Sequence, residues 1–312
     1  MRRVRIESVG VSPPRRGFFR WGALKHTVEA GKRCLAASKY RPADVRVLVN
    51  AGVHRDGHVC EPAIACYVQH ALDINVDFHG RRTLSFDLLN GSVGLLSAAH
   101  VVSAQMLAGE AAVGMVVAGE ANSDRRPDAE STFPASGAAM LLDLSPASGT
   151  GFGAFAFDTR EEQADLYTAV VSLKERRGKL LIRRRAELEE AWLEGAAAAA
   201  AEALERDGLR SSDLDLVVPA QVSPAFLSRL PAALGVAKER VADYTATLPD
   251  TLRERRFVQR ELRRRPDREI AAAVFSKKGW CGMIAHYVQS NYTRHWAVAA
   301  FLQPAGSRNP VS

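Results

Sequence analysis

Apolar and polar positions in the first half of the chain alternate between helical and extended patterns. A helical run over 27–38 leads through a polar turn into the apolar strand 45–49, and a second strand over 83–89 precedes an Ala-rich helix over 95–107. Strands that alternate with helices of about ten or more residues are typical of βαβ units. The pattern predicts an α/β fold with a mostly parallel sheet.

The second half repeats this plan. A helix predicted over 187–206 leads through a polar turn into the strand 214–218, which ends in a loop at Pro219. Strands are also predicted over 113–120 and 152–157, with a run of small residues over 136–142 between them. The strand over 152–157 completes the first half. We therefore expect two similar halves, residues 1–165 and residues 166–312.

A short turn containing glycine joins the strand 83–89 to the helix 95–107. Its central residue, Ser92, is expected at the amino end of that helix, where backbone N–H groups and the helix dipole favour negative charge. This position suits a nucleophile, but it also suits a residue that only caps the helix. The local sequence by itself favours the capping role.

The composition is that of a globular protein, with 47% hydrophobic and 25% charged residues in a chain of 312. The steady scatter of Val, Leu and Ile excludes a disordered chain and a coiled coil. Lys and Arg number 42 against 35 Asp and Glu, which gives a net charge of +7 and favours acidic partners. No helix-turn-helix, zinc-finger or RNP signature accompanies the arginines, so nucleic acid is not the expected partner.

Four cysteines are few for this length, and none forms a Cys-x-x-Cys pair. This usage is typical of a reducing compartment. The first residues lack the apolar block of a signal peptide, and no stretch reaches about 18 apolar residues. We expect a cytoplasmic protein with no membrane-spanning segment.

Several segments, in their order along the chain, resemble the β-ketoacyl-ACP synthase III branch of the thiolase superfamily. The most specific is Phe-Asp-Leu-Leu-Asn-Gly-Ser-Val-Gly at 86–94, which is similar to the nucleophile turn of that family. Segments 60–66, 219–221 and 275–282 are similar to the loop and helix before the nucleophile, to a Pro-His-Gln motif and to the terminal glycine-rich loop. The resemblance implies a thiolase fold of five layers, αβαβα, with two duplicated halves. It also implies a dimer, with strands near 113–117 paired across a twofold axis.

Members of this family use a cysteine, a histidine and an asparagine to accept an acyl group from coenzyme A or acyl carrier protein and, usually, to condense it with a malonyl unit. At the aligned positions this chain has Ser92 for the cysteine, Ala220 for the histidine and Asp250 for the asparagine. The oxyanion glycine of the terminal loop corresponds to Lys277. The chain thus resembles a synthase III with a degenerate active site.

These replacements predict the loss of ordinary condensing activity. A serine hydroxyl needs a general base within hydrogen-bond reach, and Ala220 removes the expected one. Decarboxylative condensation also forms an enolate, for which an alanine and a carboxylate provide no comparable donors. Loss of a single such donor typically lowers the rate by about 10²- to 10³-fold.

Two other residues offer weaker replacements for the missing base. Asp250 is an alternative base for Ser92, although relatives with a serine and an aspartate keep a histidine between the two. His286 follows the terminal loop and lies too far along the chain to replace the missing histidine. Neither residue restores the catalytic pattern of the family.

A metal site and a cysteine nucleophile are both disfavoured. His54, His58 and Cys60 form a lone H-x₃-H-x-C pattern in a loop, which is weak support for a metal site. We expect neither a metal nor a cofactor. The cysteines at 60, 66 and 281 are expected to be small buried apolar groups.

The loop around Glu61 has a separate expected role. In the family, the segment that corresponds to 60–62 reaches across the dimer interface towards the acyl tunnel of the other subunit, and it usually presents an apolar residue. A carboxylate at Glu61 would contact the partner's substrate or act as a base there. An ion pair within the interface is an equally good interpretation.

The segment 253–268 has eight arginines against three acidic residues, a local charge of +5. On a helix, Arg256 and Arg260 share one face with two further arginines. Such a face attracts the phosphates of coenzyme A or the acidic surface of an acyl carrier protein, because arginine pairs bidentately with phosphate and carboxylate. A solvated helix that keeps the protein soluble is the alternative.

Two functions follow from these observations. The first is a non-catalytic partner subunit, in a homodimer or in a heterodimer with an active homologue, that shapes the partner's tunnel in fatty-acid or polyketide-type biosynthesis. The second is a serine-dependent acyltransferase that moves a starter acyl group between coenzyme A or acyl carrier protein and an acceptor. The joint replacements at Ser92, Ala220 and Lys277 favour the first.

Overall fold

The computed structural model describes residues 3–14, 21–77, 79–124, 126–127, 131, 135–144, 151–172, 178–220, 223–243 and 295–301. At Ser92 and over 295–301 it describes the backbone alone. Some residues discussed above lie outside the described residues: Asp250, Arg256, Arg260, Lys277, Cys281 and His286. No helix in the described part of the chain is long and apolar enough to cross a membrane.

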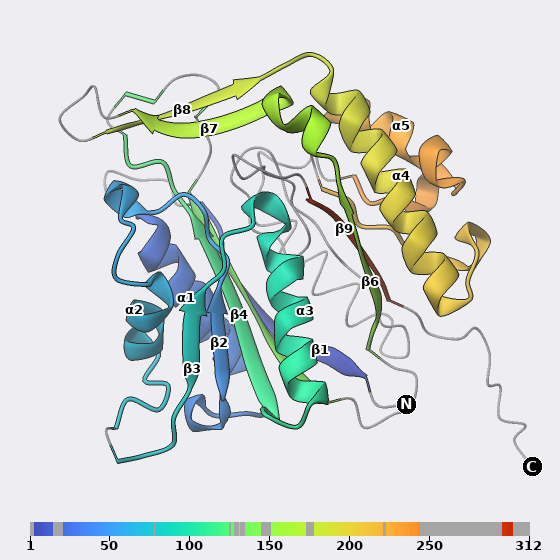
Figure 1. Ribbon diagram of the computed structural model, residues 1–312. Helices are drawn as coiled ribbons and strands as arrows, with labels where there is room; N and C mark the ends of the chain where they lie inside the picture. Colours follow the sequence, from blue (N-terminus) through green and yellow to red (C-terminus); the bar gives the residue numbers. More distant parts are fainter. Residues whose placement is uncertain are drawn as a thin grey trace, which may run out of the picture.

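The first half of the chain forms a mixed five-stranded sheet in the order β1-β5-β4-β2-β3 (Figure 1). The strands are β1 (Val4–Ser12), β2 (Val47–Asn50), β3 (Leu84–Asp87), β4 (Val113–Glu120) and β5 (Ser136–Leu144). β2 pairs in parallel with β3 and β4, but β5 is antiparallel to β4 and to β1. The sheet is therefore mixed, and the prediction of a mostly parallel sheet is wrong. The sequence between β4 and β5 lacks the apolar helical run that a parallel crossover needs.

Helices cover both faces of this sheet, and a second sheet follows (Figure 1). One face carries α1 (Ala23–Ala37) and α2 (Ile64–Ala71), and the other carries α3 (Gly94–Leu107). Beyond α3, β6 (Phe152–Thr159) pairs with β9 (His295–Phe301), and α4 (Leu188–Asp207) with α5 (Pro224–Leu234) lies outermost. The layers run α, β, α, β, α, so the expected five-layered thiolase fold is confirmed.

The second half departs from the sequence prediction in two places. β6, which was expected to complete the first half, pairs with β9 and not with the five-stranded sheet. The strand predicted over 214–218 is reduced to a single parallel bridge between Val217 and Val241. Of that run only Val218 is buried, so little apolar burial holds it in a sheet. Helix α4, by contrast, agrees with its prediction to within one residue.

A hairpin extends from the second half over the first. β7 (Tyr167–Ser172) and β8 (Lys179–Arg184) form an antiparallel pair, which lies above the ends of α3 and β4 in Figure 1. The backbone N–H of Leu180 donates a hydrogen bond of 2.9 Å to Asp124, which follows β4. The hairpin is thereby tied to the end of the sheet at which α3 begins.

The sheet order also corrects an expectation about dimer formation. β4 is hydrogen-bonded to β2 on one side and to β5 on the other. Its backbone therefore has no free edge for a strand of a second subunit, and the expected pairing across 113–117 is wrong. Among the described strands of this sheet, β1 and β3 are the end strands.

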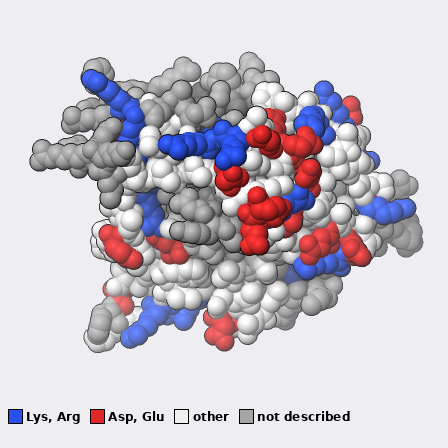
Figure 2. Space-filling model, turned by 45° about the horizontal axis from the view of Figure 1, so that its top comes forward, with Lys and Arg blue, Asp and Glu red and all other residues white. Residues whose placement is uncertain are grey.

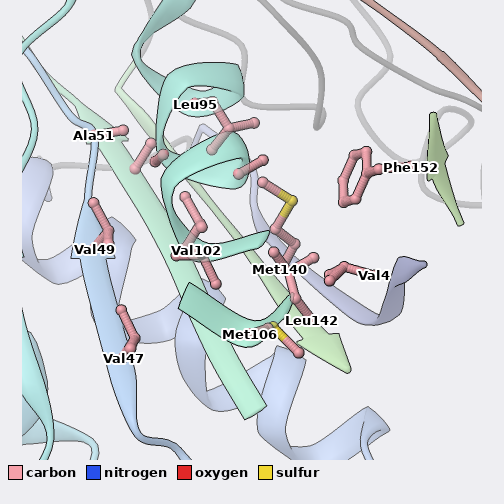
Figure 3. Packing of buried hydrophobic residues seen from close by; sticks show 14 of the residues in the cluster. Val4, Val47, Val49, Ala51, Leu95, Val102, Met106, Met140, Leu142 and Phe152 are labelled. Carbon is pink, nitrogen blue, oxygen red and sulfur yellow. The ribbon is translucent and has the colours of Figure 1, made fainter. Parts of the chain in front are cut away.

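The central helix α3 fills the space between the two sheets (Figure 3). Its buried residues Leu95, Val102 and Met106 belong to one apolar cluster with side chains of β2 and β5. Seven of the eight residues of β4 are buried, which is typical of a strand that is covered on both faces. The element that carries Ser92 at its amino end is therefore held rigidly in the core.

Gly114 of β4 marks a close approach between α3 and the sheet. A Cβ atom at Gly114 would lie 2.2 Å from Cγ1 of Val102. We expect Gly114→Ala to destabilise the protein by about 1–3 kcal/mol through overpacking. In the double variant with Val102→Ala, the smaller helix residue should offset part of this loss. Chemical denaturation of the two single variants and the double variant measures this coupling, and strictly additive losses would contradict the contact.

Candidate functional site

The turn between β3 and α3 places Ser92 at the amino end of the central helix. Gly91–Val93 forms a 3₁₀ turn, and α3 begins at Gly94. Gly91 has a φ of 51°, which residues with a side chain rarely adopt. A Cβ atom at Gly94 would lie 3.3 Å from the carbonyl oxygen of Ala51. The tight glycine turn predicted from the sequence is confirmed.

The cap position of α3 is occupied by Val93, whose side chain makes no hydrogen bond. Ser92 lies one residue earlier, in the 3₁₀ turn. Ser92 therefore does not occupy the cap position of α3 that the local sequence favoured.

Ala220 and the turn of Ser92 meet in one apolar cluster. Val93, directly after Ser92, is buried in this cluster together with Trp192 of α4 and Phe226 of α5. Ala220 is partly buried and packs against the same cluster. The residue directly after Ser92 and the residue at position 220 thus belong to the same apolar cluster. An alanine offers no proton acceptor, and apolar surroundings disfavour a charged base.

Glu61 lies in an exposed segment before α2. We name residues 53–62 the Glu61 loop. The peptide bond between Glu61 and Pro62 is cis. Val59, two residues before Glu61, is 38% exposed, so the surface of this loop is partly apolar.

The cysteines differ in their surroundings. Cys34 is buried, and desolvation raises the pKa of its thiol to about 12. Cys60 and Cys66 are exposed, one in the Glu61 loop and one on the outer side of α2. The expectation that both are buried apolar groups is wrong, because the buried side of α2 consists of Ile64, Ala65 and Val68.

Asp87, the aspartate of the Phe-Asp motif, holds the start of α2. Its carboxylate accepts hydrogen bonds from the backbone N–H groups of Ile64 and Ala65, both at 2.8 Å. N–H groups in the first turn of a helix have no partner within the helix, and the helix dipole favours a negative charge there. The strand that leads to Ser92 is thereby joined to the helix that follows Glu61.

Arg55 balances the charge of Asp87. Its Nη2 lies 2.8 Å from Oδ2 of Asp87, and the two side chains are only 9% and 10% exposed. Its Nη1 donates to the carbonyl oxygens of Cys60 at 3.2 Å and of Val59 at 3.5 Å. A buried ion pair needs such additional hydrogen bonds to compensate for desolvation. This pair connects the end of β3 to the residues directly before Glu61.

Glu120, at the end of β4, holds the start of the Glu61 loop. Its carboxylate accepts the backbone N–H groups of Val53 at 2.7 Å and of His54 at 2.8 Å. Desolvation raises the pKa of Glu120 from 4.5 to about 7 and outweighs these two bonds and the nearby charge of Arg55. Desolvation also lowers the pKa of His54 from 6.5 to about 4, with a further contribution from the charge of His58.

The middle of the Glu61 loop is bonded to α1 and to the chain after β4. Asp56 accepts the backbone N–H of Ala23 at 2.7 Å, at the start of α1. Nε2 of His58 lies 3.0 Å from Oδ1 of Asp124, the residue whose other carboxylate oxygen holds the β7–β8 hairpin. The loop is therefore fixed along most of its length before it reaches Glu61.

A metal site is not formed by the residues of the predicted pattern. Among the described residues, no group of three His, Cys, Asp or Glu side chains is placed to hold a metal ion. His58 is paired with Asp124, and Cys60 lies exposed on the loop. The weak H-x₃-H-x-C pattern therefore gains no support from the geometry.

Sequence patterns did not point to Arg55, Glu120 or Asp124 as site residues. Glu120 and Asp124 bond to residues 66 or 67 positions earlier in the chain. One sequence signal could have identified Asp87 and Glu120. Both are acidic residues near the carboxyl end of a predicted strand, and functional loops meet at that edge of the sheet in α/β proteins.

The fold matches that of known condensing enzymes. 3-Oxoacyl-(acyl-carrier-protein) synthase III from Aquifex aeolicus has a TM-score of 0.69 over 96% of this chain and 100% of its own, at 16% identity. OleA from Xanthomonas campestris, in a variant with bound lauric acid and lauroyl-CoA, has a TM-score of 0.69 over 96% and 99%, at 14% identity. The priming β-ketosynthase of a polyketide biosynthetic pathway has 0.64 over 77% and 81%, at 19% identity.

The chain therefore has the fold of the synthase III proteins and related thiolase-superfamily ketosynthases. No protein-family model matches the sequence, and no curated protein matches it significantly. Identities this low establish the fold alone, so the function has to be argued from the site.

Glu120 and His54 predict opposite pH effects on stability. A carboxyl group with a raised pKa binds its proton more tightly in the folded chain, so its contribution falls as the pH rises from 4.5 to about 7. A histidine with a lowered pKa binds its proton less tightly in the folded chain, so its contribution rises from about pH 4 to 6.5. Relative to the wild type, the free energy of unfolding of Glu120→Gln should rise by about 3 kcal/mol over the first range, and that of His54→Asn should fall over the second.

Urea denaturation at several pH values measures these differences. Glu205→Gln, at an exposed carboxylate on α4, is the matched control and should follow the wild-type profile. Parallel profiles for all four proteins would show that Glu120 and His54 titrate as they do in the unfolded chain.

Proposed function

We propose that this chain is a non-catalytic partner subunit of an active ketosynthase or acyltransferase in fatty-acid or polyketide-type biosynthesis. The observation that carries the proposal is the contrast between the two sides of the site. Ala220 packs in an apolar cluster beside the turn of Ser92 and provides no base. The Glu61 loop, in contrast, keeps a set of buried side-chain bonds that hold the backbone leading to the exposed Glu61. This arrangement suits a subunit that contributes to a site other than its own.

The similar structures support an acyl group as the ligand of the proposed complex. The similar structures include a 3-oxoacyl-ACP synthase III, a priming ketosynthase of a polyketide pathway and an OleA variant that holds lauric acid and lauroyl-CoA. We propose that the complex formed by this chain handles acyl groups carried by coenzyme A or by an acyl carrier protein. A cytoplasmic location stays a prediction from the sequence.

The proposed division into two related halves needs one adjustment. The sequence places the boundary between residues 165 and 166, which counts β6 with the first half. The pairing of β6 with β9 supports a boundary before Phe152 instead. With this boundary, the antiparallel pair of β6 and β9 in the second half corresponds to the antiparallel pair of β1 and β5 in the first.

The free edge of β3 supports a dimer of this chain with an identical or homologous subunit. Leu84, at the start of β3, and Leu89, just after it, are 52% and 59% exposed. Tyr67 of α2 and Val76 beyond it are further exposed apolar side chains. Unpaired strand edges with apolar side chains favour pairing with another chain. We propose that β3 pairs with a strand of the second subunit, over an interface above roughly 2,000 Å².

A dimer through β3 gives the Glu61 loop its proposed destination. The loop leads directly into α2, which packs against β3. Pairing through β3 therefore brings Glu61 towards the second subunit. There it acts on the partner's substrate, as a contact or a base, or it forms an ion pair within the interface.

Docking of an acyl carrier protein or of coenzyme A is proposed for Arg256 and Arg260. Figure 2 shows acidic side chains gathered to the right of the middle of the displayed face, with Lys and Arg side chains directly beside them. The displayed face therefore does not carry a single sign of charge. The support for this docking site is the local charge of +5 over 253–268, which attracts phosphates or an acidic carrier.

The second candidate function is a serine-dependent acyltransferase. The observation in its favour is the position of Ser92 directly before the first turn of α3, where backbone N–H groups favour developing negative charge. This function requires Asp250 as the base.

The isolated chain should show no β-ketoacyl synthase activity with acyl-CoA and malonyl-ACP. Ser92→Cys should not restore it, because Ala220 still leaves the enolate without a donor. Intact-protein mass spectrometry after incubation with acyl-CoA should show no acyl adduct. An adduct that disappears in Ser92→Ala would favour the acyltransferase, and 3-oxoacyl product above a no-enzyme control would refute the loss of condensing activity.

Leu84→Lys should weaken the dimer by placing a charge on the edge of β3. Leu107→Lys is the matched control, since Leu107 is similarly exposed, at 55%, but lies at the carboxyl end of α3. Sedimentation at micromolar concentration, with the homologous subunit present if the dimer is mixed, should show dissociation only for Leu84→Lys. Equal behaviour of the two variants would exclude the β3 edge as the interface.

A further inference from the structure

Arg55 lies where the Glu61 loop meets the end of β3. One end of its guanidinium is 2.8 Å from the carboxylate of Asp87, and the other contacts the carbonyl oxygens of Val59 and Cys60. The second of these carbonyls belongs to the residue directly before Glu61. One buried side chain therefore connects the loop backbone to the strand that leads to Ser92.

Asp87 acts on the other side of Glu61. It accepts the N–H groups of Ile64 and Ala65, the first two residues of α2. Glu61 is thus held between two attachments, the carbonyl of Cys60 before it and the start of α2 after it. Both attachments end on the same ion pair, so a shift of Arg55 or Asp87 would move the backbone on both sides of Glu61.

The backbone on both sides of Arg55 is also fixed. Glu120 binds the N–H groups of Val53 and His54, and Asp56 binds the start of α1. With these contacts in place, the backbone on either side of Arg55 has little freedom, and the guanidinium is directed at its partners. A lysine would not reproduce this geometry, because a single ammonium cannot span a carboxylate and two carbonyls as a planar fork does.

We infer that Arg55 is the positioning residue of Glu61. Through its contacts with Asp87 and with the carbonyl oxygens of Val59 and Cys60, it holds the loop so that the Glu61 carboxylate faces the second subunit. The destination of Glu61 rests on the proposed function. The positioning itself is a property of this chain alone. A side chain acts effectively in a site only when the surrounding residues hold it closely in position. Glu61 lies on the surface, so its backbone needs a buried support, and Arg55 provides one.

Hydrogen exchange in the purified chain tests the positioning. In Arg55→Lys, the hydrogen-bonded amides within 57–63, those of Gly57, His58 and Val59, should exchange about tenfold faster or more. The amides of Ile64 and Ala65 should stay protected, because a lysine still pairs with Asp87. Arg41→Lys, at an exposed arginine that pairs with Asp44 at 3.7 Å, is the matched control and should change nothing in this region. Wild-type exchange over 57–63 in Arg55→Lys would overturn the inference.

A second variant covers a failure of Arg55→Lys to fold. Asp87→Asn keeps an oxygen for the start of α2 but loses the ion pair, and it should also speed exchange over 57–63. Unchanged exchange there would equally overturn the inference.

Kinetics of the complex isolated from the native host, assayed with acyl-CoA, separate positioning from a general structural role. Glu61→Gln and Arg55→Lys should each lower kcat several-fold with KM unchanged, and the double variant should be no slower than Glu61→Gln. Multiplied losses would show that Arg55 acts through the fold and would refute the inference. If Glu61→Gln has no effect while the exchange result holds, the positioning stands and the proposed use of Glu61 in the partner is wrong.

Discussion

The carboxylate of Asp87 is the constraint on which this end of the molecule depends. It lies at the carboxyl end of β3, satisfies the first N–H groups of α2 and is balanced by a buried arginine. Removal of one partner from a buried ion pair typically costs about 3–5 kcal/mol, because the other charge is left without compensation. The turn of Ser92 continues from the same strand. Asp87 therefore links the start of α2 and the residues before Glu61 to the strand that leads to Ser92.

The two sides of the site differ in character. On the side of the five-stranded sheet, buried carboxylates hold the Glu61 loop through hydrogen bonds to the backbone. On the side of the second half, Val93 and Ala220 share an apolar cluster with α4 and α5. Buried charges are costly unless they are fully bonded, so a chain without a function for the loop would gain by replacing them with apolar residues. Their presence, together with an alanine at position 220, supports the proposed role in a second subunit.

Elements with long, uninterrupted apolar patterns were predictable from the sequence. Helix α4 and strand β4 agree with their predictions to within one residue, and the glycine turn before α3 follows from its motif. Relations between distant elements were not predictable in this way. The pairing of β6 with β9 joins segments that lie far apart in the chain. The antiparallel direction of β5 depends on the segment that connects it to β4, and not on the residues of β5 itself.

The site was predictable only where a motif marked it. Ser92 and Ala220 came from motifs, and Val93, the residue after Ser92, shares an apolar cluster with Ala220. Arg55 and Glu120 were missed because their partners lie far away in sequence and no local pattern joins them. The exposure of Cys60 and Cys66 depends on which side of a short helix faces the sheet, and the residue types alone do not decide that.

The central claim is that this chain works within a complex whose chemistry belongs to another subunit. Native mass spectrometry of the protein purified from its host, after exposure to an acyl-CoA, tests it most directly. The account predicts a dimer with a homologous subunit in which the acyl adduct lies on that subunit alone. An acyl group on this chain, or a chain that remains a monomer with no homologous partner, would contradict it.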